Sequence, residues 1–523
     1  MSAHRAEASL ERLVLTADAQ RAVDETAIGR GVSSVDLMES AGRSAAEWIL
    51  DRLRPTSVAL LIGPGGNGGD GLVVARRLAD AGVDTKTLLL EPRDRLRETT
   101  RTMLERLEAS GERASVLEQG ADGPVDASFD GVDWVVDALF GNGLTRPLEG
   151  RSSRIVERLN ASGARVVSLD LPSGLPSDRG ALVGAAVRAE ITLSMAFLKP
   201  AHLLHPASAA CGNVAVVSVA YPPEVLAGIE PWARVAEPAG VGLRLPSRRP
   251  DGHKGTFGRV LVVAGSIGMT GAAILCCRGA LRAGAGLVTL ASPGSLNAIL
   301  ETALPEVITV PLPDEDGRLV RIDDERLAEA FDHADVLAVG PGLSRAQATA
   351  AAVRQFVDRF QGPIVLDADG IDAFAGHLNL IRVVGQRLLL TPHPGELGRL
   401  IDRSADGIDA DRVEAARRFA QEHGVTLLLK GRPTAIGLPG GDVYLNSTGN
   451  TGLATGGSGD VLTGLIAGFV AGGASLEDAA ILGTHVHGWA AEVYAHSRAE
   501  RSFIPSDLVD LLPRVLREAE TWR

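Results

Sequence analysis

The sequence predicts two α/β domains, each a doubly wound parallel sheet with helices on both faces. Three observations predict this class. Short apolar runs alternate with amphipathic segments along most of the chain, which is typical of parallel sheets buried on both faces. The 523 residues exceed the usual size of one domain. A proline-rich stretch near residues 221–252 interrupts the alternation, because proline neither extends a helix nor joins a sheet ladder.

The N-terminal half opens with two predicted helices, over Thr16–Ile28 and Asp36–Arg54. Ser33 is a suitable N-cap for the second, since its hydroxyl can accept from a free backbone N–H of the first turn. Gly63–Gly71 is predicted to be a glycine-rich turn that leads into a helix from Leu72. The strands expected in this half are Val58–Ile62, Thr85–Leu90, Trp134–Ala138, Arg165–Leu169 and Val214–Val219.

Strand–turn–helix units resume after the proline-rich stretch. A second glycine-rich turn precedes a helix that begins near Asp460. We therefore expect an N-terminal domain over residues 1–225, a linker over 226–250 and a C-terminal domain over 251–523. The strands expected in the C-terminal domain are Arg259–Ala264, Val336–Val339, Ile364–Asp367, Leu388–Thr391 and Thr426–Lys430.

Composition excludes several classes of protein. The net charge of −13 repels phosphate at long range, which argues against general nucleic-acid or anionic-membrane binding. The three cysteines have no C-x-x-C spacing, so neither a disulfide framework nor a zinc site is expected. The N-terminus lacks the apolar core of a signal peptide, and the run Leu462–Ala474 is too short to span a membrane. We expect a cytoplasmic enzyme with glycine-rich ligand loops.

The first glycine-rich turn formally contains G-x-G-x-x-G at Gly63, Gly65 and Gly68. After a strand and before a helix, this spacing is typical of a dinucleotide pyrophosphate site. A tight turn without a ligand is an open alternative. Asp70 argues against the phosphate site, since it places negative charge where phosphate would lie, and Asn67 with Asp70 suits a cation or a sugar hydroxyl better.

Asp137 and Asp170 each stand at the carboxyl end of a predicted strand and are followed closely by glycine. In a doubly wound sheet these strand ends converge on one crevice, which is the usual ligand site. Together with Asp70 they supply the groups needed for a cation and for general acid/base chemistry.

Three motifs of the N-terminal half, G-P-G-G-N-G-G-D-G-L, V-D-A-L-F-G-N-G-L-T-R-P-L and L-D-L-P-S-G, resemble the NAD(P)H-hydrate epimerase domain over about residues 10–225. That family, with a Rossmann-like three-layer sandwich, interconverts the R and S epimers at C6 of hydrated NADH and NADPH. The resemblance implies that Asn67, Asp137 and Ser173 hold a potassium ion, and that Asp170 is the catalytic acid/base, with Lys199 as a further candidate.

The same resemblance implies a set of residues that line the bound hydrate. The family usually has two asparagines in the first loop, and Gly66 here replaces the first of them. The implied lining residues are Gly66, Asn67, Gly68, Gly69, Asp70, Gly141, Asn142, Gly143, Leu144, Thr145, Arg146, Pro147 and Asp170.

The second glycine-rich turn is Thr455-Gly456-Gly457-Ser458-Gly459-Asp460. The free amides at a helix N-terminus stabilise an oxyanion or a phosphate. An aspartate beside them suits phosphoryl transfer to a hydroxyl, since it can take the hydroxyl proton. An Asp that only caps the helix is an open alternative. No G-x-x-x-x-G-K-[ST] motif occurs, which excludes a P-loop.

Motifs around this turn resemble the NAD(P)H-hydrate dehydratase domain, a ribokinase-like three-layer sandwich, over about residues 245–515. They are H-K-G-T-F-G from His253, M-T-G-A from Met269, G-P-G-L from Gly340, T-P-H-P-G-E from Thr391, K-G-R-P-T from Lys430 and T-G-G-S-G-D from Thr455. That family phosphorylates the C6 hydroxyl of the S-hydrate with ADP or ATP and then eliminates phosphate.

This second resemblance assigns roles at the strand ends. It implies that Asp460 is the catalytic base and that Gly457–Gly459 form the anion hole. Asp367, Asp369 and Glu396 could assist Mg²⁺ through water, although a turn role for D-A-D-G is an equal alternative. The implied nucleotide contacts are Lys430, Gly431, Arg432, Pro433, Thr434 and Gly459, and the implied hydrate contacts are Ala272, Gly342, His393 and Asp460.

The two resemblances together predict a bifunctional nicotinamide-nucleotide repair enzyme. Its expected small-molecule partners are the NADH and NADPH hydrates and ADP or ATP, with no nucleic acid and no membrane, and we expect a homo-oligomer. Two alternatives stay open: a ribokinase-like vitamin or sugar kinase with an attached dehydrogenase-like domain, and an N-terminal domain that only binds its ligand. His485 and His487 lie two residues apart on a predicted helix, so they are not expected to share a metal ion.

Overall fold

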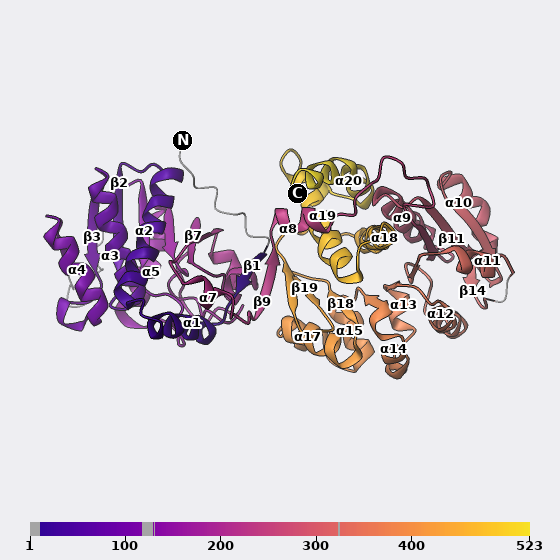
Figure 1. Ribbon diagram of the computed structural model, residues 1–523, viewed down its shortest axis with the longest axis horizontal. Coiled ribbons are helices and arrows are strands. Elements are labelled where there is room, and N and C mark those ends of the chain that lie inside the picture. Colours follow the sequence, from indigo (N-terminus) through magenta and orange to yellow (C-terminus); the bar gives the residue numbers. More distant parts are fainter. Residues whose placement is uncertain (1–10, 118–128, 130, 323–324) are drawn as a thin grey trace. The chain divides into compact units, whose positions relative to one another are not determined.

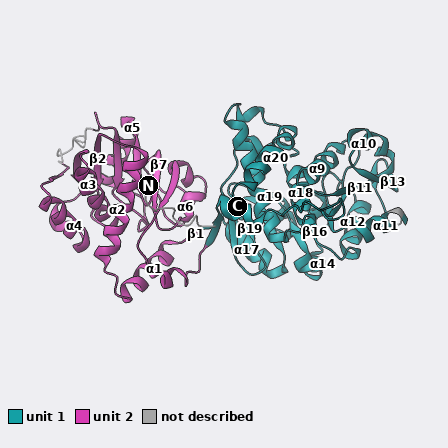
Figure 2. Ribbon diagram, turned by 45° about the horizontal axis from the view of Figure 1, so that its top comes forward, with its two compact units in different colours: residues 1–12, 233–523 teal, residues 13–232 magenta. Residues whose placement is uncertain are grey.

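The computed structural model describes residues 11–117, 129, 131–322 and 325–523. Residues 1–10, where the sequence predicts no signal peptide, lie outside this range. The chain divides into two compact units, residues 13–232 and residues 1–12 with 233–523 (Figure 2). Each unit is an α/β sandwich with helices on both faces of its sheet, as the sequence predicts.

The smaller unit contains a seven-stranded sheet in the order β4-β3-β2-β5-β6-β7-β8. Every neighbouring pair is parallel. The chain runs outward from β2 through β3 to β4 and then crosses to the other side of β2, where β5 to β8 follow, so the order reverses between β2 and β5. In sheet order the strands are β4 (Ala114–Val116), β3 (Asp84–Leu89), β2 (Ser57–Ile62), β5 (Trp134–Ala138), β6 (Val166–Leu169), β7 (Ile191–Met195) and β8 (Asn213–Val217).

Helices cover both faces of this sheet (Figure 1). One apolar cluster joins α2, α3 and α4 to one face, and another joins α5 to the opposite face. Ser33 caps α2 as predicted, since its hydroxyl accepts from the Asp36 N–H at 3.0 Å. The helices are α1 (Ala17–Gly29), α2 (Ser34–Arg52), α3 (Gly66–Asp80), α4 (Glu98–Ala109), α5 (Gly150–Ser162), α6 (Pro200–Leu203) and α7 (Pro223–Leu226).

The larger unit contains an eleven-stranded sheet that is parallel from β12 to β18 and then turns antiparallel at β19 and β20. The antiparallel part was not foreseen; residues 430–433 between β18 and β19 are too few for a crossover and allow only a hairpin. In sheet order the strands are β1 (Glu11–Val14), β9 (Ala233–Ala236), β20 (Val443–Asn446), β19 (Thr434–Gly437), β18 (Thr426–Leu429), β17 (Leu388–Leu390), β16 (Ile364–Leu366), β15 (Val336–Val339), β10 (Arg259–Val263), β11 (Leu287–Pro293) and β12 (Ile308–Leu312), with a separate hairpin of β13 (Asp314–Glu315) and β14 (Arg318–Leu319).

The helices of the larger unit also form two layers (Figure 1). The largest apolar cluster joins α9, α18, α19 and α20 to one face of the sheet. The helices are α8 (Pro238–Arg244), α9 (Thr270–Arg282), α10 (Asn297–Ala303), α11 (Glu325–His333), α12 (Gln347–Arg359), α13 (Asp369–Asp372), α14 (Leu378–Val384), α15 (Pro394–Ile401), α16 (Ala405–Asp409), α17 (Arg412–His423), α18 (Ser458–Ala471), α19 (Leu476–Ala495) and α20 (Pro505–Glu520).

The stretch expected as a linker, residues 226–250, is structured in its second half. Residues 233–236 form β9, which pairs with β20 through Arg234 and Tyr444, and α8 follows directly. The prolines are compatible with this structure because Pro238 occupies the first turn of α8, where its missing N–H would have no helical partner. The long segment of the larger unit therefore begins at Ala233.

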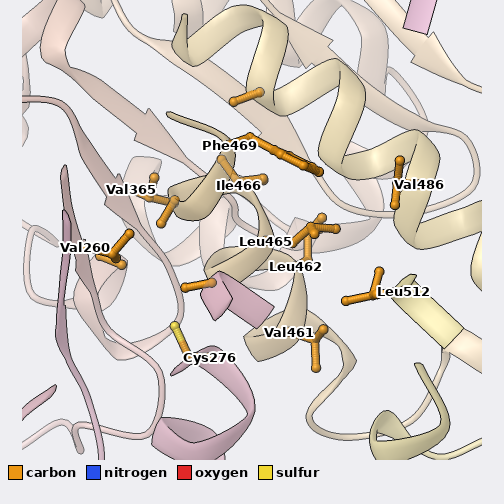
Figure 3. Packing of buried hydrophobic residues seen from close by; sticks show 14 of the residues in the cluster. Val260, Cys276, Val365, Val461, Leu462, Leu465, Ile466, Phe469, Val486 and Leu512 are labelled. Atoms are coloured by element: carbon orange, nitrogen blue, oxygen red, sulfur yellow. The ribbon is translucent and has the colours of Figure 1, made fainter. Parts of the chain in front are cut away.

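Helix α18 is buried at the centre of the larger unit (Figure 3). Val461, Leu465 and Ile466 are fully buried in the cluster that also contains Cys276 of α9 and Val486 of α19. Glycines let α18 and α9 approach backbone to backbone: a Cβ at Gly464 would overlap the carbonyl oxygen of Cys276. This packing fixes the N-terminal end of α18, where Asp460 lies.

Helix α3 begins at Gly66, six residues before the predicted start at Leu72. The sequence misled here because glycine has a poor helix propensity. The glycines are needed for packing: a Cβ at Gly68 would overlap the carbonyl oxygen of Gly63, and one at Gly69 would overlap the sulfur of Met38. Asn67 and Asp70 consequently lie in the first turns of a helix, beside the carboxyl end of β2.

The close approach at Gly68 predicts a specific loss of stability. We expect Gly68→Ala to lower the free energy of unfolding of the smaller unit by about 1–3 kcal/mol, because the added methyl must displace backbone. Gly66→Ala is the matched control, since a Cβ there meets nothing within 4 Å. Urea unfolding followed by circular dichroism compares the two variants. Equal stability of both would contradict this account of α3.

Candidate functional sites

A cleft of about 770 Å³ lies at the carboxyl ends of the strands in the smaller unit. Its position beside β2 and β5 is the point at which the strand order reverses, the usual ligand site of such a sheet. It is lined by polar groups from α1, α3 and the loops after β5 and β6, over an apolar wall from α1 and α2. The residues used below that line it are Gln20, Arg21, Asp24, Gly66, Asn67, Asp70, Arg95, Arg97, Gly141, Asn142, Gly143, Leu144, Asp170 and Tyr221.

Asp170 and Lys199 form a buried ion pair at the floor of this cleft. Lys199 is completely buried, and its ammonium also donates to the carbonyl oxygens of Met195 at 3.1 Å and Phe197 at 3.0 Å. Burial alone would raise the pKa of Asp170, but the adjacent Lys199 charge and its hydrogen bond hold that pKa below its usual value. Asp170 is therefore ionised at neutral pH and able to accept a proton.

The backbone around Asp170 is held by a neutral histidine. Asp170 has a φ of +64°, an uncommon conformation for a residue with a side chain. His202 Nδ1 accepts from the Lys199 N–H at 3.0 Å, so Nε2 carries the proton and donates to the Asp170 carbonyl oxygen at 2.9 Å. Burial and the Lys199 charge lower the pKa of His202 to about 4. His202 thus orients the Asp170–Lys199 pair, and no sequence motif singled it out.

The residues implied for potassium lie beside the cleft. Asp137 is fully buried and accepts from Ser173, through its N–H at 2.8 Å and its hydroxyl at 2.6 Å. Asn67 has both side-chain polar atoms buried without a hydrogen-bond partner. A buried amide oxygen without a partner is costly, and a cation would satisfy it. The donor set of amide, carboxylate and hydroxyl oxygens fits a hard monovalent cation.

The other residues that the epimerase resemblance implies fall into two groups. Gly66, Asn67, Asp70, the segment Gly141–Leu144 and Asp170 all line the cleft. Gly68 and Gly69 are buried against neighbouring backbone and side chains instead, and Thr145, Arg146 and Pro147 are exposed outside the lining.

Two cleft residues that the sequence did not indicate lie far apart in the chain. Asp24 of α1 accepts a short hydrogen bond from the Tyr221 hydroxyl, which in turn accepts from Gln20 Nε2 at 2.9 Å. Burial raises the pKa of Asp24, although the Tyr221 hydrogen bond opposes this. Neither residue belongs to a recognisable motif.

In the larger unit Asp367, at the end of β16, is the centre of a buried polar cluster. Its carboxylate accepts from Thr391 at 2.7 Å and from Thr463 at 2.8 Å, and it forms an ion pair with Lys430 at 2.8 Å. Glu396 lies 3.7 Å from the same ammonium. Burial alone would lower the pKa of Lys430, but the charges of Asp367 and then Glu396 raise it above its usual value, so Lys430 stays charged and can neutralise an anion.

Asp460 lies in the first turn of α18, directly after Gly459. A Cβ at Gly459 would stand 3.5 Å from Lys430 Nζ, which places the start of α18 against the Lys430–Asp367 pair. Burial, and next the Asp367 charge, raise the pKa of Asp460 to about 7, although Lys430 opposes this. The first-turn amides of α18 have no intrahelical partners. A carboxyl that gains and loses a proton near neutral pH thus adjoins an anion site.

Ala272, Gly342 and His393 are spread around the same edge of the sheet. A Cβ at Gly342 would meet the Ala272 side chain at 2.9 Å, so these two residues are adjacent. His393 caps α15, with Nδ1 accepting from the Gly395 N–H at 3.0 Å, and its ring is 3.4 Å from Glu396. Lys430–Pro433 form the connection from β18 to β19, with Gly431 and Arg432 exposed, and Thr434 is the first residue of β19.

The carboxylates considered for magnesium already have protein partners. Asp367 is engaged as above, Asp369 accepts from the Ser344 N–H at 2.8 Å, and Glu396 accepts from the His393 N–H at 2.8 Å. Within the described residues no group of three or more His, Cys, Asp or Glu side chains could hold a metal. These residues therefore fit magnesium only as an ion carried by nucleotide phosphates and water, its common mode.

His485 and His487 are both buried in α19, and burial lowers the pKa of each to about 4. His487 Nε2 lies 2.9 Å from the Ser458 carbonyl oxygen, so it ties α19 to the first turn of α18. Both side chains therefore lie in the core of the larger unit, one of the two locations that the sequence predicts for them. None of the described helices is long and apolar enough to cross a bilayer.

The two units define a two-domain α/β enzyme, with an acid/base cleft in one unit and a carboxyl beside a helix N-terminus in the other. A family model described as NAD(P)H-hydrate dehydratase matches residues 260–514, and one described as YjeF-related protein N-terminus matches residues 34–201. The bifunctional NAD(P)H-hydrate repair enzyme Nnr of Moorella thermoacetica is 39% identical over 94% of this chain and 93% of its own length. The chain belongs to the family of bifunctional NAD(P)H-hydrate repair enzymes.

Two further relatives illustrate the extent of the match. The enzyme of the same description from Salinibacter ruber is 39% identical over 97% of this chain and 96% of its own length. The solved structure of the ADP/ATP-dependent NAD(P)H-hydrate dehydratase from Bacillus subtilis, co-crystallised with ATP/Mg²⁺, is 30% identical with a TM-score of 0.47, and the match covers 54% of this chain and 98% of that one.

Proposed function

We propose that the smaller unit interconverts the R and S epimers of hydrated NADH and NADPH, and that the larger unit dehydrates the S epimer with consumption of ADP or ATP. The observation that carries this proposal is the presence of two separate acid/base centres, Asp170 with Lys199 and Asp460 beside Lys430. One centre suits exchange at a carbon that bears a hydroxyl, and the other suits phosphoryl transfer to that hydroxyl.

In the smaller unit Asp170 is the acid/base group. Its carboxylate accepts from the Asn142 N–H at 3.2 Å, which holds one oxygen toward the loop after β5. Lys199 keeps the carboxylate ionised, and His202 fixes the backbone that carries it. Asn67, Asp137 and Ser173 would hold potassium, whose positive charge offsets the negative charge of the phosphates in an otherwise acidic cleft.

Exchange of potassium for tetramethylammonium should therefore reduce the rate of epimerisation.

In the larger unit Asp460 takes the proton of the C6 hydroxyl as its oxygen attacks the terminal phosphorus of the nucleotide. The shortened nucleotide departs, and phosphate then leaves C6 with loss of a C5 proton, which restores the dihydronicotinamide. The amides that begin α18 hold the transferred phosphoryl group, and Lys430 with residues 431–434 contacts the nucleotide. Magnesium bound to the nucleotide phosphates would neutralise their charge. Ala272, Gly342 and His393 are assigned to the hydrate.

The raised pKa of Asp460 predicts the pH dependence of dehydration. Asp460 accepts a proton only when ionised, and its pKa is about 7. The rate should therefore fall as the pH drops through about 7, and level off above it. We would measure kcat/KM for the S-hydrate between about pH 5.5 and 9. A rate that stays constant down to pH 5.5 would show that Asp460 is not the base.

The stoichiometry of the nucleotide tests the proposed reaction directly. Incubation of the full chain with S-hydrate and ADP should yield AMP, phosphate and restored NADH in equal amounts, resolved by ion-exchange chromatography. A stable phosphorylated product without NADH would instead favour a simple kinase.

A cytoplasmic location and a homo-oligomeric state stay predictions, and light scattering of the purified protein tests the oligomeric state.

A further inference from the structure

The cleft of the smaller unit contains more carboxyl groups than its buried cation can balance. Asp24, Asp70 and Asp170 all line it, whereas Lys199 is committed to Asp170. The arginines that line it, Arg21, Arg95 and Arg97, have no ion pair with any of the three carboxyls in the described structure. Three ionised carboxylates would also repel an anionic dinucleotide.

Asp70 differs from the other two in its partners. Asp170 receives the Lys199 ammonium and the Asn142 N–H, and Asp24 receives the Tyr221 hydroxyl. Within the part of the chain that the structure describes, the Asp70 carboxyl has no hydrogen bond and no ion pair. Burial, followed by the charges of Asp170 and then Asp24, raises the pKa of Asp70 well above its usual value, although Lys199 opposes this. Of the three carboxyls, Asp70 therefore holds a proton most readily, and no hydrogen-bond partner in the described structure competes for that proton.

The sheet order brings Asp70 and Asp170 to the cleft from opposite sides. Asp70 lies on α3, which follows β2, and Asp170 follows β6; β5 stands between these two strands. A ligand in the cleft beside β5 thus has a proton donor from one flank and an ionised carboxylate from the other. Inversion at one carbon needs this arrangement, because the leaving group departs from one face and its replacement arrives on the other.

Asp24 and Tyr221 influence the pKa of Asp70 through the charge of Asp24, although neither residue contacts Asp70 through an ion pair. The Tyr221 hydroxyl donates to Asp24 and is itself held by Gln20. The hydrogen bond stabilises the charged form of Asp24, and that charge raises the pKa of Asp70. The other charged groups that face Asp70 are Asp170 and Lys199. Among the described residues Asp24 makes no hydrogen bond or ion pair with either of them, so its replacement leaves the contacts of the Asp170–Lys199 pair in place.

We propose that Asp70 is the acid that protonates the departing C6 hydroxyl during epimerisation, opposite the Asp170–Lys199 pair, with Asp24 and Tyr221 as positioning residues; this rests on the proposed epimerase function. The C6–O bond breaks, the oxygen leaves as water with the Asp70 proton, and the N1 lone pair forms an N1=C6 double bond. Water then adds to the opposite face and gives a proton to Asp170. Solvent returns this proton to Asp70, so the cycle is balanced and involves no redox change.

The test measures conversion of R-hydrate to S-hydrate by the full chain in the absence of ADP, with the epimers separated chromatographically. We expect Asp70→Asn to lower kcat by about 100-fold or more, with KM changed only slightly, because an amide fills the same space without an acidic proton. The matched control is Asp80→Asn, at the exposed end of the same helix. ADP-dependent dehydration of S-hydrate by the larger unit should be unchanged in both variants.

Two further readouts separate this role from a structural one. Epimerisation in H₂¹⁸O should place ¹⁸O at C6 in each product molecule. The wild-type rate should fall at high pH as Asp70 ionises, and Asp24→Asn should move this fall to lower pH, since it removes a charge that raises the pKa of Asp70. The variant Asp70→Glu should restore part of the activity that Asp70→Asn loses.

Several results would overturn the proposal. They are a wild-type kcat in Asp70→Asn, a loss confined to KM, and epimerisation without ¹⁸O incorporation, which would mean that the C6–N1 bond opens instead. If the rate of Asp24→Asn falls at the same high pH as that of the wild type, Asp24 and Tyr221 do not act on Asp70. If the wild-type protein does not interconvert the epimers, the proposed epimerase function is wrong. This failure differs from a failure of the role proposed for Asp70, which would show only in the variants.

Discussion

Asp460→Asn should abolish ADP-dependent dehydration of the S-hydrate while interconversion of R and S continues at the wild-type rate. Asparagine has nearly the same shape as aspartate, but it cannot take the proton of the attacking hydroxyl. Loss of a general base costs about 10²–10⁴-fold in rate, and we expect the upper part of that range because Asp460 is the residue that adjoins both the anion site and Lys430. Absorbance of the reduced nicotinamide measures the rate directly.

The variant also has a simple control. Asp510→Asn removes an exposed carboxylate from α20 and should leave both reactions unchanged. Because burial and the Asp367 charge raise the pKa of Asp460, its removal also relieves repulsion, and Asp460→Asn should be at least as resistant to urea as the wild type. Appreciable dehydration by a folded Asp460→Asn protein would show that another group accepts the proton.

Asp170→Asn should have the complementary effect: epimerisation is lost, and dehydration of pure S-hydrate is retained. The change removes the acid/base group of the cleft and leaves the Lys199 ammonium buried beside an amide. Breaking one partner of a buried ion pair costs about 3–5 kcal/mol, so the smaller unit should also unfold at a lower urea concentration. The rate loss should again be about 10²–10⁴-fold.

Stability and chemistry can be separated by a second change. Lys199→Met leaves a carboxyl in place but removes the charge that lowers the pKa of Asp170. Asp170 should then be protonated near neutral pH, and epimerisation should recover as the pH rises. Asp170→Asn, in contrast, should stay inactive at every pH. Loss of S-hydrate dehydration in a folded Asp170→Asn protein would contradict the separation of the two activities.

The main elements of both sheets were predictable because each is a continuous apolar run. Trp134–Ala138 and Val336–Val339 were predicted with their observed ends. Strands of this kind are buried on both faces, so their sequence alone marks them. The positions of three site carboxyls were predictable for a related reason. Asp137 lies at the end of β5, and Asp170 and Asp367 directly follow β6 and β16, at the edge where a parallel sheet binds its ligands.

Other features depend on contacts between distant parts of the chain. Asp24 meets Tyr221 across 197 residues, and neither has a neighbouring motif. Strand β9 was expected as part of a linker because its pairing with β20 cannot be seen locally. The start of α3 was missed because glycine has little preference for a helix. Gly68 and Gly69 are needed there because the backbone of Gly63 and the side chain of Met38 leave no room for a Cβ.

Both sites share one physical arrangement. In each, an aspartate that directly follows a strand forms an ion pair with a lysine: Asp170 with Lys199, and Asp367 with Lys430. In each, a second carboxyl on the helix after a glycine-rich turn has a raised pKa, Asp70 on α3 and Asp460 on α18. Burial is the first cause of this raised pKa in both sites and the charge of the paired aspartate is the second, whereas the lysine opposes it.

The most direct test of the central claim is the extent to which an equal mixture of R and S hydrates is converted to NADH by the full chain with excess ADP. If one chain has both activities, the wild type should convert the whole mixture to NADH. Asp170→Asn should convert only the S fraction and then stop. A control without enzyme measures how much of the R epimer converts spontaneously. A wild-type reaction that stops at the S fraction would contradict the account, because the smaller unit would then not supply the substrate of the larger one.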